Sequence, residues 1–389
     1  LFGLTHNAVI KNIKLAEVQI DAAAGDGVGA LIGQAIGTLE LSHIEVQSGS
    51  ISGSDGVGGI VGRIYGTETI VSDCINRASV SSAANNSKAG GISSIASSAL
   101  VRCTFKDCEN YGMIQGSNAG GMMGYAGNQS GDSEINFENC NNYGEIDARQ
   151  SVDGAGGYAG GIVGYDSGSS GKTINYINCV NEGNVFSDEN DAAGGITGYA
   201  GDAKERGFKE CSNKGDITGG SDAGGIVGSI NGGIGNVITR CTVTDHAVIA
   251  AVSVAGGIVG TNGGELTVDG CMVADTVELR TSAVVTDNAD SVWYGYVRGV
   301  AVGKTRQADT IIKNMSDYGE YELVADIYDI GTANEYTFEN CVAVNPMRWF
   351  TNSSSINLHL VNSHFSGIVM NKNAVLITAD ENSSVDELV

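Results

Sequence analysis

An apolar residue followed three positions later by another apolar or small residue recurs twelve times along the chain, at intervals near thirty residues. The residue just before the second member is polar in every copy but one, where it is Gly270. A fixed period of this length is typical of a solenoid, in which each unit buries its apolar side by stacking on the next. The twelve pairs are Ile10/Ile13, Leu41/Ile44, Val71/Cys74, Phe105/Cys108, Phe137/Cys140, Tyr176/Cys179, Phe208/Cys211, Ile238/Cys241, Val268/Cys271, Ile312/Met315, Phe338/Cys341 and Leu360/Ser363.

A second motif, glycine, glycine or alanine, two further residues and glycine, alternates with the first. Glycine at the same place in each unit suits a corner with positive φ, or two backbones in close contact. The copies begin at Gly29, Gly58, Gly120, Gly160, Gly194, Gly224 and Gly256, with a degenerate copy at Gly90.

One unit is clearest from Thr173 to Tyr199. Alternating apolar and polar residues predict a half-buried strand, and a corner with asparagine and glycine precedes two further short strands. An asparagine two residues after the column cysteine recurs in five units, and buried amides at a corner can hydrogen-bond along the stack. These asparagines are Asn76, Asn110, Asn142, Asn181 and Asn213.

These patterns predict an all-β fold, a single-stranded right-handed parallel β-helix of about twelve coils of roughly 30 residues. The right-handed sense follows from the usual preference of parallel β crossovers. We expect regular repeats over residues 1–275, and divergent coils with a C-terminal cap of the same elongated domain over 276–389. The least repetitive part, 280–303 around Trp293, could form either an altered coil or a cap.

Eight of the nine cysteines fall on one column of the repeat, and Cys103 lies off it. Neighbouring coils stack about 4.8 Å apart, whereas a disulfide needs Cβ atoms about 3.8 Å apart with a specific twist. We therefore predict a structural ladder of buried free thiols. Its members are Cys74, Cys108, Cys140, Cys179, Cys211, Cys241, Cys271 and Cys341.

The net charge of −24 disfavours nucleic acid as a partner, because its recognition requires basic patches. No run of eighteen apolar residues occurs, so we expect no membrane insertion. Neither a metal site nor a cofactor is predicted, although Ca²⁺ could use acidic loops such as Asp188–Asp191. The five histidines are scattered, and His359 and His364 lack the neighbours expected of a metal site.

The repeat of GGIVG, a strand ending in I-x-N-C and then G-x-I resembles the GLUG-type repeats of bacterial surface proteins. Leu1-Phe2-Gly3 and Ile10–Ile13 fit the same pattern, and the resemblance covers residues 1 to 275. Such repeats occur in secreted or wall-attached adhesins and in non-catalytic parts of immunoglobulin A-cleaving metallopeptidases. The resemblance implies a secreted or cell-surface location and flanking domains in a longer chain. It carries over no catalytic residue, and the sequence lacks an HExxH motif.

Aromatic residues supply the candidate ligand-binding positions. Tyr125, Tyr165 and Tyr199 directly follow the last glycine of three successive glycine motifs and should lie on one face. Tyr111 and Tyr143 form a second pair. Aromatic faces with a polar tip could stack on sugar rings, but packing between coils explains them equally well.

Acidic residues suggest a different function. Asp73 and Asp107 share a column position, and glycosidic cleavage uses two carboxylates about 5–9.5 Å apart. Because Asn139 and Asn178 continue that column, solvated acids at the strand edges explain the pattern better.

We therefore expect a non-enzymatic, adhesin-like or spacer module that binds a host glycan or protein. The alternatives are a polysaccharide lyase or hydrolase, and a non-catalytic region of a larger surface protease.

Overall fold

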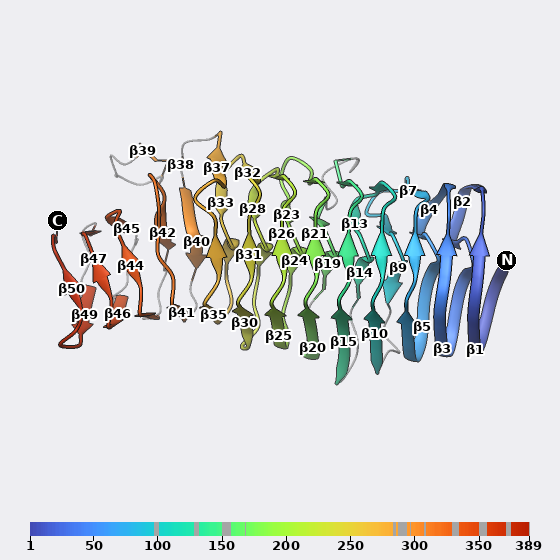
Figure 1. Ribbon diagram of the computed structural model, residues 1–389, viewed down its shortest axis with the longest axis horizontal. Coiled ribbons are helices and arrows are strands. Elements are labelled where there is room, and N and C mark those ends of the chain that lie inside the picture. The colour runs from blue at the N-terminus through green and yellow to red at the C-terminus, as the bar shows by residue number, and fades with distance from the viewer. Residues whose placement is uncertain are drawn as a thin grey trace.

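The chain folds as a parallel β-solenoid, seen in a computed structural model (Figure 1). Its strands stack from the N-terminal end to the C-terminal end, and 43 of them belong to one sheet. The structure describes residues 1–96, 101–127, 132–149, 157–167, 169–282, 285–286, 294–295, 297–306, 309–328, 334–349, 356–370 and 375–388.

Each regular coil contributes one strand to each of five parallel ladders, whereas the sequence pattern predicted three strands per coil. The first ladder carries the repeated apolar residue. Its strands are β1 (Phe2–Leu15), β3 (Ile32–Val46), β5 (Val61–Ser72), β10 (Arg102–Lys106), β15 (Ser133–Glu138), β20 (Ser169–Ile177), β25 (Ala203–Lys209), β30 (Asn236–Thr239), β35 (Leu266–Asp269), β41 (Thr310–Lys313), β43 (Glu335–Glu339), β46 (Ile356–Val361) and β49 (Val375–Ala379).

The second ladder follows the column cysteine, and the third forms the opposite wall. The second contains β6 (Ile75–Asn76), β11 (Glu109–Asn110), β16 (Asn141–Asn142), β21 (Val180–Asn181), β26 (Ser212–Asn213), β31 (Thr242–Val243) and β36 (Met272–Val273). The third contains β2 (Val18–Gly29), β4 (Gly49–Gly58), β7 (Ser79–Ser82), β12 (Ile114–Gln115), β17 (Ile146–Asp147), β22 (Val185–Phe186), β27 (Ile217–Gly219), β32 (Val248–Ala251) and β37 (Glu278–Thr281).

The fourth and fifth ladders lie on either side of the glycine motif. The fourth contains β8 (Lys88–Gly90), β13 (Asn118–Gly120), β18 (Ala159–Gly160), β23 (Ala192–Gly194), β28 (Asp222–Gly224) and β33 (Val254–Gly256). The fifth contains β9 (Ser93–Ala96), β14 (Met123–Ala126), β19 (Val163–Asp166), β24 (Thr197–Ala200), β29 (Val227–Ile230) and β34 (Val259–Asn262), and β40 (Val297–Arg306) continues both. β42 (Glu322–Tyr328) stacks on β40.

The coils vary in length. About eight turns of about 31 residues form the regular part, so the coil count differs slightly from the predicted value of about twelve. Beyond it Val268 pairs with Ile312, 44 residues later, and Phe338 pairs with Leu360, only 22 residues later. Short ladders complete this end: β44 (Val342–Ala343), β47 (His364–Phe365) and β50 (Ser384–Val385), with β45 (Met347–Trp349) beside β48 (Ile368–Met370). The division at residue 275 and the handedness stay predictions.

The least repetitive segment is described only in part. Residues 287–293, with Trp293, lie outside the described residues. The described part contains a two-residue antiparallel pair, β38 (Val285–Thr286) with β39 (Tyr294–Gly295).

The polar residue before each column residue forms the corner between the first and second ladders. It adopts a left-handed conformation throughout, with φ of 52° at Asp73, 51° at Asn139 and 49° at Arg240, for example. Gly270, the exception in the sequence pattern, has φ of 59° and occupies the same corner. Asparagine, aspartate and glycine tolerate this conformation best, which explains their frequency at the corner.

The glycine pairs allow neighbouring backbone segments to pack closely, and they do not have positive φ. A Cβ on Gly161 would lie 2.1 Å from the carbonyl oxygen of Gly195, and one on Gly160 would lie 1.9 Å from that of Val163. Real Cβ atoms do not approach oxygen so closely, so glycine allows the sharp bend between the fourth and fifth ladders in these coils, while Ala30 takes the second position of the motif in the N-terminal coil.

Identical side chains stack along the interior. The rings of Phe105, Phe137, Tyr176 and Phe208 lie parallel, with centroids 5.2, 5.3 and 4.6 Å apart along the row. All nine cysteines are free and buried. Burial raises the pKa of the Cys103 thiol, and it raises that of Cys341 to about 11. The thiols therefore behave as small apolar groups in the stack.

Candidate functional site

The chain bends at each glycine pair, between the fourth and fifth ladders. The outward side chains of the fourth and fifth ladders face each other across this bend. The Lys88 ammonium lies 5.9 Å from the centroid of the Tyr125 ring, and Tyr158 lies 5.1 Å from Tyr165 and 4.6 Å from Tyr199. The two outward rows therefore contact each other along the bend, and we call the surface between them, at the glycine pairs, the groove.

The three tyrosines named from the sequence lie in register on the fifth ladder. Tyr125 pairs with Tyr165, and Tyr165 pairs with Tyr199, on adjacent strands. Their ring centroids are 5.3 and 5.1 Å apart, with interplanar angles of 52° and 72°. The rings are half-buried and tilted, so they present edges as well as faces to the groove.

Tyr158 and Lys88 were not recognised from the sequence. Both precede the glycine pair and belong to the opposite wall, so only the bend reveals that they contact the tyrosine row. A repeated aromatic or cationic residue just before Ala-Gly-Gly would have been the signal, but it occurs in too few coils to form a pattern.

A polar pocket of about 270 Å³ lies at the N-terminal end of the tyrosine row. Arg63 in this pocket binds the carboxylates of Asp26 and Asp55, the latter at 2.7 Å, and donates to the Tyr65 hydroxyl at 3.2 Å. The pocket is lined by Asp55, Arg63, Tyr65, Asn86, Lys88, Ile95, Tyr125 and Tyr165. Aromatic rings beside fixed charged and amide groups can hold a molecule with both an apolar face and hydroxyl groups.

The tyrosine hydroxyls are protonated at neutral pH. Burial raises the pKa of Tyr158, Tyr165 and Tyr199, with the nearby charge of Asp191 adding to the effect at Tyr158. The Tyr165 phenol can therefore donate a hydrogen bond to a ligand in the groove, whereas the Tyr158 hydroxyl is hydrogen-bonded to Asp191 and the Tyr199 hydroxyl to Asn231.

Charged residues line the groove further along. Asp222 on β28 is near Thr261, and the positive charges of Arg306 and Lys304 act on it. Burial nevertheless raises the pKa of Asp222, since desolvation is the larger effect.

The second tyrosine pair lies on the second ladder, outside the groove. Tyr111 and Tyr143 stack with centroids 4.6 Å apart and an interplanar angle of 17°. The Arg77 guanidinium lies 4.1 Å from the Tyr111 ring centroid, and the Tyr111 hydroxyl donates to Glu109 at 2.9 Å. The stacked rings and the Arg77 contact join adjacent coils, whereas the hydrogen bond to Glu109 lies within one coil.

The acids that suggested glycosidic cleavage are corner residues. Asp73 and Asp107 both have the left-handed conformation described above. The Asp107 carboxylate accepts a hydrogen bond from Asn139 at 2.9 Å, and Asn178 in turn donates to Asn139 at 3.3 Å. This outer row of amides and carboxylates gives the column a structural role.

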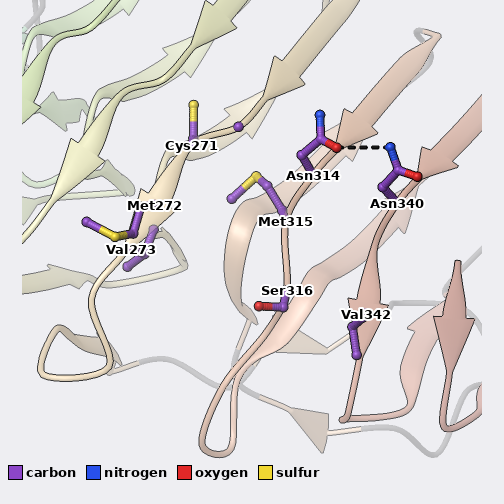
Figure 2. A pocket seen from close by; sticks show the side chains of 9 residues that line it. Cys271, Met272, Val273, Asn314, Met315, Ser316, Asn340 and Val342 are labelled. Carbon is purple, nitrogen blue, oxygen red and sulfur yellow. Dashed lines mark hydrogen bonds between the residues drawn. The ribbon is translucent and has the colours of Figure 1, made fainter.

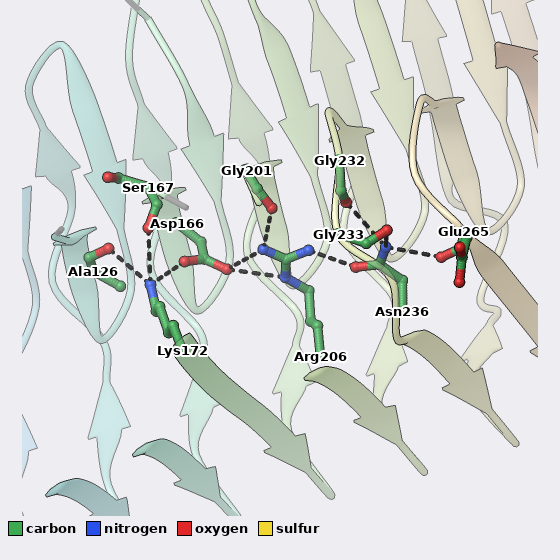
Figure 3. A network of polar contacts seen from close by, with 10 residues as sticks. All are labelled: Ala126, Asp166, Ser167, Lys172, Gly201, Arg206, Gly232, Gly233, Asn236 and Glu265. Atoms are coloured by element: carbon green, nitrogen blue, oxygen red, sulfur yellow. Dashed lines mark hydrogen bonds and ion pairs between the residues drawn. The ribbon is translucent and has the colours of Figure 1, made fainter. Parts of the chain in front are cut away.

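A buried ionic network is centred on Asp166, the last residue of β19 (Figure 3). Asp166, next to Tyr165, forms ion pairs with Lys172 and Arg206, and all three side chains are fully buried. Arg206 contacts Asp166 through Nε at 2.9 Å and Nη2 at 2.7 Å, and its other Nη donates to Asn236 at 2.6 Å. Burial lowers the pKa of Lys172, and the carboxylate of Asp166 opposes this shift. The network joins neighbouring coils behind the groove and stiffens its wall.

The acidic loop considered for Ca²⁺ has a different arrangement. Asp188 accepts a hydrogen bond from the backbone N–H of Glu189 at 2.8 Å, and Asp191 lies beside Tyr158. Throughout the described ranges, no three histidine, cysteine or acidic side chains gather as a metal site. Within the same ranges, no helix is long and apolar enough to cross a membrane.

No family model, curated protein or solved structure matches this chain.

Proposed function

We propose that this chain is a non-enzymatic, adhesin-like module of a bacterial surface protein, built from GLUG-type repeats, and that its tyrosine groove binds a host glycan. The observation that carries the proposal is the aromatic row of Tyr125, Tyr165 and Tyr199 facing Tyr158 and Lys88 across one groove.

A glycan fits the chemistry of this groove. Sugar rings have apolar faces that stack on aromatic side chains, and hydroxyl edges that accept and donate hydrogen bonds. Protonated phenols, Lys88 and the Asp55–Arg63 pair supply the polar partners. Because the rungs repeat every 4.8 Å or so, the groove offers equivalent contacts along a polymer rather than one closed cavity.

The rest of the molecule supports presentation of such a groove. Side-chain ladders and the buried Asp166 network link each coil to the next, so the groove walls are preorganised. A preorganised surface loses little conformational entropy on binding. The same stiffness suits a spacer that holds a flanking domain away from the cell.

The test is a glycan-array screen of the protein, with depolymerisation of each bound glycan measured in parallel. We expect binding without cleavage, and loss of at least tenfold in affinity in the double variant Tyr165→Ala/Tyr199→Ala. The matched control is Tyr111→Ala/Tyr143→Ala, which removes an exposed tyrosine pair from another ladder and should bind normally. Failure to bind any glycan would reject the glycan proposal and leave the spacer function.

A polysaccharide-cleaving enzyme is the second candidate, favoured by Asp222. This groove carboxyl has a raised pKa and lies near the charges of Lys304 and Arg306, as expected of a general acid. Cleavage that is abolished in Asp222→Asn, but retained in the exposed variant Asp202→Asn, would establish this function instead.

A further inference from the structure

The second ladder opens between two neighbouring coils, next to β36. Below the opening the coils are joined: the N–H of Gly270 donates to the carbonyl of Lys313 at 3.1 Å, and Asn314 donates to the Asp269 carboxylate at 2.6 Å. Beyond it they separate, and a pocket of about 590 Å³ lies between β36 and Met315 (Figure 2).

The regular coils show which backbone groups should meet here. The N–H after each column cysteine donates to the cysteine carbonyl one coil earlier, as in Thr242 to Cys211 and Met272 to Cys241, both at 2.9 Å. Two residues later the pattern repeats, as in Ala274 to Val243 at 2.9 Å.

In the part of the chain that the structure describes, the corresponding hydrogen bonds are missing between β36 and the coil that contains Met315. They would join the N–H of Ser316 to the carbonyl of Cys271, and the N–H of Tyr318 to the carbonyl of Val273. Among the described residues, neither hydrogen bond forms, and β36 pairs only with β31. Two carbonyl acceptors, those of Cys271 and Val273, therefore lie on one side of the opening and the N–H of Ser316 on the other, while Tyr318 is bridged to Tyr321.

Two tyrosine hydroxyls bond the backbone of the segment that follows β36. The Tyr318 hydroxyl donates to the carbonyl of Val277 at 3.0 Å, and the N–H of Leu279 donates to the Tyr321 hydroxyl at 3.2 Å. These contacts engage the backbone of Val277 and Leu279, whereas among the described residues no hydrogen bond reaches the carbonyls of Cys271 and Val273. The following coil is paired again, since Val342 donates to the carbonyl of Met315 at 3.1 Å.

We propose that this opening, the β36 slot, binds an extended peptide segment of a partner protein as an added parallel strand. A peptide backbone offers N–H donors to the carbonyls on one side of the slot and carbonyl acceptors to the N–H on the other side, at the spacing of a β-strand. The slot volume lies within the usual range of about 300–1,000 Å³ for binding pockets.

The slot also indicates which side chains the segment carries. Cys271, Val273 and Met315 are buried, so the inward positions of the segment should be small and apolar. The protein carries a net charge of −24, and Asp269 and Asp275 flank β36, which favours a segment with a basic residue.

A seven-residue peptide copied from residues 238–244, with C241A to avoid disulfide formation, is a suitable probe. It has one arginine and no acid, and its native counterpart pairs with the opposite edge of β36 in the same residue register. Fluorescence anisotropy with the complete protein would measure binding. Peptide methylated at the backbone nitrogens of Thr242 and Thr244 cannot donate to Cys271 and Val273, so its affinity should fall at least tenfold. Methylation at Ile238, outside the slot, is the control and should have little effect.

Two further measurements locate the bound peptide. Hydrogen exchange at the N–H group of Ser316 should slow on peptide addition, while that at Tyr165 stays unchanged. The variant Asp269→Asn/Asp275→Asn should weaken binding several-fold, and Asp202→Asn should not. Equal affinity for the methylated and unmethylated peptides, absence of binding, or self-association of the protein through the slot would overturn the proposal.

Discussion

The side-chain amide of Asn142 donates to the side-chain oxygen of Asn181 at 2.8 Å, although 39 residues separate them. The same nitrogen donates to the carbonyl of Gly144 at 2.8 Å, and the Asn142 oxygen accepts from Asn110 at 2.8 Å. Every polar group of this fully buried side chain is therefore used within the stack. Such a ladder links each coil to both neighbours by bonds that water cannot replace.

Asn142→Ala should lower the free energy of unfolding by about 3 kcal/mol, because it leaves neighbouring buried amides without a partner. Urea denaturation followed by far-UV circular dichroism measures the change. The exposed Asn190→Ala is the matched control and should unfold like the wild type. Equal stability of the two variants would show that the ladder contributes little.

Gly161→Ala should destabilise the protein by about 3 kcal/mol, since its Cβ would lie 2.1 Å from the backbone oxygen of Gly195. The thermal unfolding midpoint measures this effect. Gly3→Ala is the control, because its Cβ would meet nothing within 4 Å. If both variants melt at the wild-type temperature, the close approach at the groove floor is not required.

Substitutions at Gly270 test the left-handed backbone conformation without steric crowding. Its φ is 59°, and a Cβ there would have only the Arg240 side chain within 4 Å, at 3.8 Å. Gly270→Asn should cost less than about 1 kcal/mol, whereas the β-branched Gly270→Val should cost about 2 kcal/mol. Equal losses in a denaturation series would argue against a left-handed corner.

The thiol ladder should make the protein less stable as the pH rises above 9. Thiols of the unfolded chain ionise near pH 9, whereas burial keeps that of Cys341 protonated up to about pH 11. The folded state then binds more protons, so stability present below pH 9 is lost as pH rises through this window. Urea midpoints at pH 7.5 and pH 10 measure the loss, and Cys341→Ala should reduce it. A midpoint that rises with pH would contradict the buried thiols.

Sequence periodicity was sufficient for the stack, because each coil repeats the same apolar and corner residues. The column of Cys140 and Cys179 and the amides of Asn142 and Asn181 follow directly from their spacing. The exact coil count did not follow, since turns such as Phe338 to Leu360 shorten without losing the apolar signal.

The groove and the β36 slot required three-dimensional information. Tyr158 and Tyr199 are 41 residues apart, and only the inward bend at the glycine pair places their rings 4.6 Å apart. The slot arises because the coil after Gly270 diverges from its neighbour. Hydrogen bonds that are missing from a ladder leave no motif in the sequence. The Asp166–Arg206 pair was missed for a related reason, since single charged residues in a variable stretch show no period.

The distance between two residues along the solenoid should depend on the number of paired strands between them, and not on their separation in the sequence. Lys106, Lys209 and Lys313 lie on one column, three rungs apart each, through successive pairings of the first ladder. Spin labels on paired lysine-to-cysteine variants can be measured by double electron–electron resonance, since the native thiols are buried. We predict backbone separations of about 14 Å for 106/209 and about 29 Å for 106/313, at about 4.8 Å per rung. Broad distributions, or equal distances for the two pairs, would contradict the stacked register.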